Sequence, residues 1–123
     1  MRNQARSLLV IDDDEFIVDL VTSVAESDGY TVSSACTPAA LEACLAQSWN
    51  IILLDLTMPE LDTVTALRMI ADAQPACAVA IFSGADDTSV RTATTVAGFY
   101  GLTVLGSLSK SGMGELREFL SRH

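Results

Sequence analysis

Five short runs of apolar and β-branched residues recur along the chain, and longer amphipathic stretches separate them. The runs cover residues 7–11, 30–34, 50–54, 77–82 and 102–105. Four of them are almost continuously apolar, which is typical of strands buried on both faces of a sheet. The run at 30–34, YTVSS, favours a strand through its residue types instead. The pattern therefore predicts five strands.

The stretches between these runs show the spacing of amphipathic helices. Apolar residues lie at 16, 17, 20, 21 and 24, at 41, 44 and 45, at 64, 67, 69 and 70, at 90, 93 and 97, and at 116, 119 and 120. Gly29 is placed to end the first helix, and Pro75 closes the third. Thr37 followed by Pro38 is typical of a helix start. We expect the fourth helix over residues 86–97.

Strands that alternate with helices favour parallel βαβ units with right-handed crossovers. The 123 residues are enough for one hydrophobic core, and half of them are hydrophobic. We find no repeat, linker or low-complexity segment that divides the sequence. We therefore expect residues 1–123 to form a single α/β domain, a doubly wound parallel sheet with helices on both faces.

The charge balance narrows the classes of partner. The formal net charge is −9, and Lys and Arg form no cluster. This argues against direct binding of nucleic acid or of an anionic membrane surface. No apolar run approaches the roughly 20 residues that cross a bilayer, and the run near the N-terminus is too short for a signal peptide. We expect a cytoplasmic protein.

Cysteine and histidine offer no metal site. Cys36, Cys44 and Cys77 show no paired spacing, and the only histidine is His123. A zinc site of the usual Cys/His type is therefore not expected. Free cysteine behaves as a small apolar residue, so we expect all three to be reduced and buried in the core.

Carboxylates follow two of the predicted strands. Asp12, Asp13 and Asp14 come after the first strand, and Asp55 comes after the third. In an open parallel sheet the ligand site lies beyond the carboxyl ends of the strands. We expect Asp14 mainly to cap the first helix. The other carboxylates would repel one another without a cation, and Mg2+ prefers such oxygen ligands. A cation would also keep Asp55 ionised, as a nucleophile requires.

Two further strand ends add a hydroxyl group and a positive charge. Ser83 follows the fourth strand, and the run at 106–109 after the fifth strand leads to Lys110. Such groups surround the equatorial oxygens of a phosphoryl group in transfer. Taken singly, Ser83 is readily explained as a turn residue and Lys110 as a surface lysine. Their joint occurrence with the acids at four strand ends favours a functional site.

Four motifs resemble the receiver domain of two-component response regulators over essentially the whole chain. They are LLVIDDDE, IILLDLTMPELD, IFSG and LGSLSK, in this order. The resemblance implies a flavodoxin-like fold with five parallel strands in the order 2-1-3-4-5. It also implies that Asp55 accepts a phosphoryl group, with Mg2+, from the phosphohistidine of a histidine kinase or a phosphotransfer protein.

The resemblance assigns roles to five other residues. Asp13 would bind Mg2+ directly, and Asp12 would act as a metal ligand through water. Thr57 would add its backbone carbonyl as a ligand, beside the carboxylate of the phosphoacceptor. Ser83 matches the hydroxyl residue that hydrogen-bonds the phosphoryl group, and Lys110 matches the lysine that pairs with it.

Three residues depart from the pattern of the family. Ser111 replaces the proline that usually follows the lysine, often after a cis bond. A cis bond before a residue other than proline costs about 2.5–4 kcal/mol. The Lys110–Ser111 bond is therefore either trans, with a different approach of the lysine, or strained. Ser107 replaces a frequent aromatic switch residue, and Thr63 replaces a common glycine.

The positions two residues beyond Asp55 and Ser83 predict a slow loss of phosphate. They hold Thr57 and Ala85, and neither is a carboxylate or an amide that would orient a hydrolytic water. We therefore expect a long-lived phospho-aspartate.

The segment GLTVLGSLSK is similar to the end of receivers that precede EAL-type cyclic-di-GMP phosphodiesterase domains. It implies a C-terminal output domain outside this chain, and a stand-alone receiver is the open alternative. A homodimer on phosphorylation is a further expectation, and we expect no enzyme activity beyond self-phosphorylation and dephosphorylation.

Two rival functions stay open at this point. The first is a receiver-like interaction or dimerisation module that is never phosphorylated. The second is a small Mg2+-dependent phosphatase, but the sequence Asp55-Leu56-Thr57 lacks the second carboxylate of that family's motif.

Overall fold

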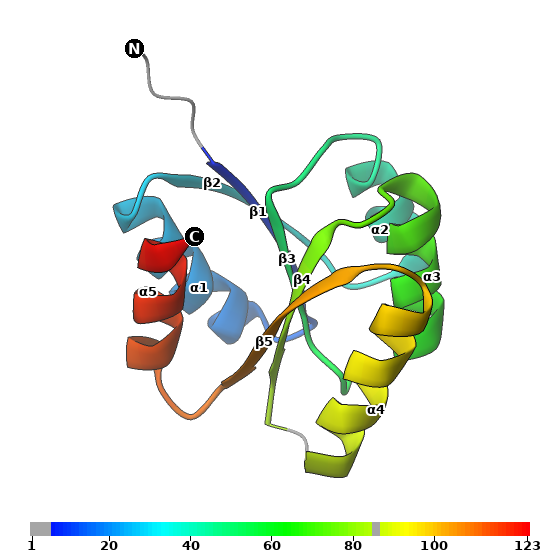
Figure 1. The fold of residues 1–123 in the computed structure, drawn as a ribbon. Coiled ribbons are helices and arrows are strands. Elements are labelled where there is room, and N and C mark those ends of the chain that lie inside the picture. Colours follow the sequence, from blue (N-terminus) through cyan, green and yellow to red (C-terminus); the bar gives the residue numbers. More distant parts are fainter. Residues whose placement is uncertain (1–5, 85–86) are drawn as a thin grey trace.

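A computed structural model describes residues 6–84 and 87–123, and within them strands and helices alternate. The strands are β1 (Arg6–Ile11), β2 (Tyr30–Ala35), β3 (Ile51–Leu54), β4 (Ala78–Ser83) and β5 (Thr103–Ser109). The helices are α1 (Glu15–Ser27), α2 (Pro38–Cys44), α3 (Thr63–Ala73), α4 (Asp87–Phe99) and α5 (Met113–Arg122). The strands pair in parallel in the order β2-β1-β3-β4-β5 (Figure 1). The predicted doubly wound, flavodoxin-like fold is confirmed.

Helices cover both faces of the sheet. α1 and α5 lie on one face, and α2, α3 and α4 lie on the other (Figure 1). Successive residues of a strand point to opposite faces, so Leu53 packs with α1 and α5 whereas Leu54 packs with the other three helices. Both side chains are fully buried. This double burial explains why the central strands are continuously apolar in sequence.

The predicted start and end of α1 and the predicted start of α2 are confirmed. Asp14 caps α1, because its carboxylate accepts hydrogen bonds from two backbone N–H groups of the first turn. Gly29 follows α1 at a φ of +88°, in the left-handed region that favours glycine. Thr37 caps α2, with Pro38 at its first position. Within the described residues, no helix is both long and apolar enough to span a bilayer.

The fifth strand is longer than predicted. The apolar pattern gave residues 102–105, but β5 continues to Ser109 and pairs with β4 over its whole length. The run at 106–109 contains glycine and serine, which in isolation indicate a loop. Pairing with β4, which no local pattern reveals, keeps it extended. The fourth helix ends at Phe99 rather than at residue 97, and its predicted first residue, 86, lies outside the described residues.

A bulge interrupts β5 at its middle. Two consecutive residues of β4 pair with Val104 and Gly106, so Leu105 is the extra residue. Gly106 has a φ of +135°, a conformation that residues with a Cβ rarely adopt. The extra residue reverses the alternation of side chains beyond it. Leu108 therefore packs into the core beneath α1 and α5, on the face opposite to Val104.

The cysteine prediction was wrong for two of three residues. Cys77 is buried, but Cys44 is only half-buried and Cys36 is exposed. Cys36 directly follows the edge strand β2, where one side of the chain has no neighbouring strand to cover it.

Substitution of Gly106 by alanine should destabilise the protein, although an added Cβ would meet no atom within 4 Å. We expect a loss of about 1–3 kcal/mol in the free energy of unfolding, because alanine is strained at this φ. Gly98 in α4 is the matched control, since its φ is not positive. Gly98→Ala should stabilise the protein by about 0.5–1 kcal/mol. Urea unfolding measures both, and equal effects of the two variants would contradict the bulge geometry.

Candidate functional site

Four strand ends bring the predicted site residues to one edge of the sheet. Asp12 directly follows β1, Asp55 follows β3, Ser83 ends β4, and Lys110 follows β5. The register sets the last residues of β1 and β3 side by side and pairs the last residues of β4 and β5. The arrangement is the one expected for the carboxyl edge of a doubly wound sheet.

Asp12, Asp13 and Asp55 form a compact acidic cluster. One carboxylate oxygen of each lies within 4.8 Å of the other two. Asp12 and Asp55 are nearly fully buried, at 3% and 2% exposed, whereas Asp13 is exposed. Asp12 and Asp13 also line an open cavity of about 420 Å³, bounded by α1, the end of β2 and the start of α2. Carboxylates this close repel one another and present hard oxygen ligands to a divalent cation.

Lys110 supplies the positive charge of the site. Its Nζ lies 2.5 Å from Oδ2 of Asp12 and 3.2 Å from Oδ1 of Asp55. Burial alone would lower the pKa of Lys110, but the two carboxylates outweigh it and hold that pKa above its ordinary value. Burial raises the pKa of Asp12 and the charge of Asp55 adds to this, although Lys110 favours the ionised form. Lys110 therefore stays protonated and bridges the two buried carboxyl groups.

Hydrogen bonds from neighbouring residues also orient the two buried carboxylates. The N–H and the hydroxyl of Thr57 both donate to Oδ1 of Asp55, at 3.3 and 3.2 Å. The N–H of Asp14 donates to Oδ1 of Asp12 at 2.9 Å. The backbone N–H of Asp14 therefore contacts Asp12, while its carboxylate caps α1. As predicted, Asp14 is not part of the acidic cluster. The role of the Thr57 carbonyl as a metal ligand stays a prediction.

Ser83 is buried at the same edge, with 6% of its surface exposed. It pairs in register with Ser109, the residue before the lysine. Ser83 therefore ends β4, the neighbour of β3, and Asp55 directly follows β3. Ala85, the other position used to predict a slow loss of phosphate, lies outside the described residues.

The peptide bond between Lys110 and Ser111 is trans, because the described residues contain no cis bond. Of the two alternatives left open by the sequence, the unstrained one holds. The lysine reaches both carboxylates from this backbone. Ser107, at the place of the aromatic switch residue, is exposed on β5.

Sequence reasoning missed the contacts that surround the lysine. The N–H of Ser109 donates to Oε1 of Glu115 at 2.8 Å, and the N–H of Ser111 donates to Oγ of Ser109 at 3.1 Å. The available signal was a glutamate in the first turn of the last helix, three residues after its N-cap, Gly112.

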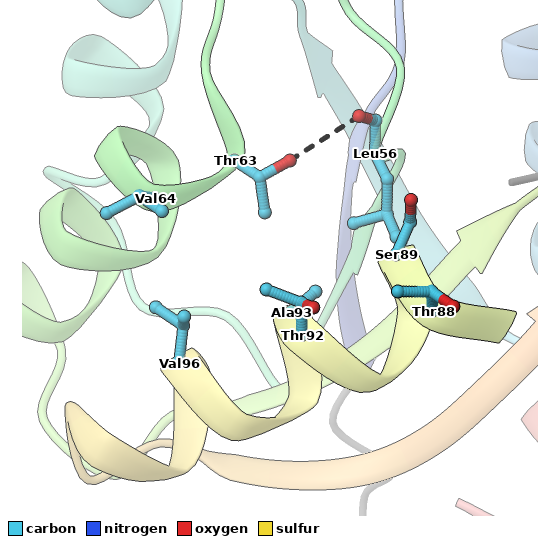
Figure 2. Close-up of a pocket in the computed structure, with 8 residues that line it drawn as sticks. All are labelled: Leu56, Thr63, Val64, Thr88, Ser89, Thr92, Ala93 and Val96. Carbon is cyan, nitrogen blue, oxygen red and sulfur yellow. Dashed lines mark hydrogen bonds between the residues drawn. The ribbon is translucent and has the colours of Figure 1, made fainter. Parts of the chain in front are cut away.

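A second cavity, of about 250 Å³, lies between α4, the start of α3 and Leu56 in the segment that follows β3 (Figure 2). Its lining residues carry only apolar and hydroxyl groups: Leu56, Thr63, Val64, Thr88, Ser89, Thr92, Ala93 and Val96. The hydroxyl of Thr63 donates to the carbonyl of Leu56 at 3.5 Å, so the threonine at the usual glycine position ties this segment together. Among the residues that the structure describes, no titratable side chain lines this cavity.

The solved structures that resemble this chain include several response regulators. A response regulator from Colwellia psychrerythraea is 28% identical, with a TM-score of 0.80, and the match covers 97% of this chain and 96% of that chain. A signal receiver domain from Bermanella marisrubri is 23% identical, with a TM-score of 0.79 and coverages of 97% and 98%. NtrX from Brucella abortus is 24% identical, with a TM-score of 0.76, and the match covers 97% of this chain but 26% of that chain.

The comparison with family models agrees with the fold and the site. No curated protein matches the chain. The model of the response regulator receiver domain matches residues 8–110, which extend from β1 to the lysine of the site. The chain therefore belongs to the family of response regulator receiver domains.

Proposed function

We propose that Asp55 accepts a phosphoryl group from the phosphohistidine of a histidine kinase or a phosphotransfer protein. The observation that carries this proposal is a carboxylate 2% exposed at the end of β3, with the Nζ of Lys110 3.2 Å from its Oδ1. In the reaction a carboxylate oxygen attacks phosphorus, the P–N bond of the donor breaks, and its electron pair leaves with the imidazole. The product on this chain is an acyl phosphate.

Mg2+ fits the acidic cluster as the partner of this reaction. Asp12, Asp13 and Asp55 would hold the ion, with the backbone carbonyl of Thr57 as a further ligand. The support is the donor set, three carboxylates with oxygens within 4.8 Å, because Mg2+ prefers hard oxygen ligands. When bound, the ion neutralises negative charge on the transferring phosphoryl group.

Lys110 and Ser83 would contact the phosphoryl group once it is attached. Lys110 already lies against Asp55, so its ammonium needs only a small movement to pair with a new phosphoryl oxygen. Ser83 would donate its hydroxyl from the neighbouring strand. A dianion at this edge would favour a state in which these residues and the segment after β4 are repositioned, and thus switch an output or partner surface.

The proposed function is that of a signalling domain. The chain would catalyse only the transfer of phosphate to Asp55 and its loss. The match to NtrX of Brucella abortus covers 26% of that longer chain. This supports a receiver joined to an output domain as one possible organisation of the whole protein. None of the comparisons supports the EAL type, which stays a prediction from sequence, as does a homodimer on phosphorylation.

Acetyl phosphate with Mg2+ should add one phosphoryl group to the protein. Asp55→Ala should abolish the gain in intact mass, because the nucleophile is lost. The matched control is Asp62→Asn, since Asp62 is exposed in the following loop and caps α3. Unchanged labelling of Asp55→Ala would refute the assignment, and no labelling of the native protein would favour an interaction module that is never phosphorylated.

Removal of one charge from Asp13 should weaken Mg2+ binding by tenfold or more, which corresponds to about 1.4 kcal/mol. Asp13→Asn keeps the shape of the side chain but removes a carboxylate from the cluster. Glu15→Gln is the control, because Glu15 lines the same cavity outside the cluster. Isothermal titration calorimetry measures the affinity without any phosphorylation. Equal losses in both variants would show that only the general acidity of the surface attracts the ion.

The phospho-aspartate should be long-lived in the purified protein. Thr57 donates to Asp55 and Ala85 carries no polar group, so neither side chain is suited to orient an attacking water as an amide or carboxylate would. Thr57→Gln should therefore shorten the lifetime several-fold, as measured by intact mass after removal of acetyl phosphate. Rapid loss from the native protein, in the absence of a phosphatase, would contradict this expectation.

A further inference from the structure

The turn that carries Lys110 is held by side chains that have no place in the proposed reaction. We define the lysine turn as residues 109–112, which connect the end of β5 to α5 (Figure 1). Ser109 and Ser111 flank the lysine and are both exposed, whereas the lysine side chain points inward and is 17% exposed. The direction of the lysine therefore depends on the backbone of the two serines.

Three hydrogen bonds close this turn. The backbone N–H of Ser109 donates to Oε1 of Glu115 at 2.8 Å. The N–H of Ser111 donates to Oγ of Ser109 at 3.1 Å, and the two serine hydroxyls lie 2.8 Å apart. The residues before and after Lys110 are thus joined to each other, and one of them is joined to α5.

Glu115 provides a fixed point for the turn. It lies in the first turn of α5, where its negative charge is favoured by the helix dipole. The next residue, Leu116, is fully buried, so the backbone of Glu115 cannot shift without disturbing the core. Gly112, the N-cap of α5, makes no side-chain cap, so Glu115 is the acidic group available at this helix start.

We infer that Glu115 and Ser109 are positioning residues for Lys110. They hold the lysine turn so that Nζ sits between the carboxylates of Asp12 and Asp55, at 2.5 and 3.2 Å. The hydrogen bond from the N–H of Ser111 to Ser109 is part of this turn, and a proline at position 111 could not donate it. The inference deepens the proposed function, because a positioned lysine matters for the rate only if Asp55 accepts phosphate.

The contribution of the turn is modest but measurable. Lysine has a long flexible side chain, so a loose backbone would let its ammonium leave the two carboxylates for water. A hydrogen bond between exposed groups changes the ratio of the bonded to the unbonded geometry only by a few-fold. We therefore expect a three- to tenfold effect, on the order of a single net hydrogen bond, rather than loss of the reaction.

The test compares five single variants of the whole chain. Glu115→Ala removes the acceptor for the Ser109 N–H, whereas Glu115→Gln keeps an amide oxygen at the same place. Glu118→Ala is the matched control, because Glu118 is exposed on the same helix and its carboxylate pairs with Arg122 at the surface. Ser109→Ala and Ser109→Thr form a second pair, in which threonine keeps the hydroxyl.

Two readouts separate positioning from a general structural role. The first is the NMR signal of the Lys110 ammonium in the unphosphorylated protein, which should be protected from exchange while it contacts the buried carboxylates. The second is the rate of labelling by acetyl phosphate at saturating Mg2+. Glu115→Ala and Ser109→Ala should speed exchange of the Lys110 ammonium protons and slow labelling, each three- to tenfold, with an unchanged unfolding midpoint. Glu115→Gln, Ser109→Thr and Glu118→Ala should behave like the native protein.

The outcomes are distinguishable. A protected signal and a native rate in Glu115→Ala and Ser109→Ala would overturn the inference. Equal slowing in Glu118→Ala would also overturn it, because it would show a general effect of charge on α5. If the native protein is not labelled at all, the proposed function fails, and the NMR signal alone still decides whether the turn positions the lysine.

Discussion

The contact of Lys110 with Asp12 and Asp55 is the interaction on which the site depends. Two carboxylates that are 3% and 2% exposed cannot stay ionised at low cost without an opposite charge. Lys110 supplies one positive charge to a cluster of three carboxylates that includes Asp13. With all three carboxylates ionised, the cluster keeps two negative charges that the lysine does not neutralise. A divalent cation carries the positive charge that would balance these two negative charges.

The position of the lysine follows from features of β5 that lie well before it. The extra residue at the bulge reverses the side-chain alternation, and Leu108 thereby packs into the core beneath α1 and α5. Leu108 fixes the end of the strand, two residues before the lysine. The contact of Glu115 with Ser109 then fixes the turn from the side of the helix. Lys110 is thus held between a strand end and a helix start that are both anchored in the same core.

Most of the fold was predictable because its central strands are covered on both faces. That constraint makes their sequences continuously apolar, and it marks Asp55 as the point where β3 leaves the core. The carboxyl ends of parallel strands share one edge, so the meeting of Asp12, Asp55 and Lys110 could also be predicted. The end of β5 could not be predicted, because pairing with β4 keeps residues 106–109 extended although their composition is typical of a loop. Exposed Cys36 shows the same limit, since burial at an edge strand depends on neighbours that the sequence does not reveal.

Chemical mapping of the phosphorylated residue tests most directly whether the carboxylate of Asp55 is the nucleophile toward phosphorus. Borohydride reduces an acyl phosphate to an alcohol, so a phosphorylated aspartate is converted to homoserine, which peptide mass spectrometry locates. After incubation with a phosphorylated histidine kinase or phosphotransfer protein, we predict homoserine at position 55 and at no other aspartate. Homoserine at Asp12 or Asp13 instead, or phosphate retained on another residue type, would contradict the account.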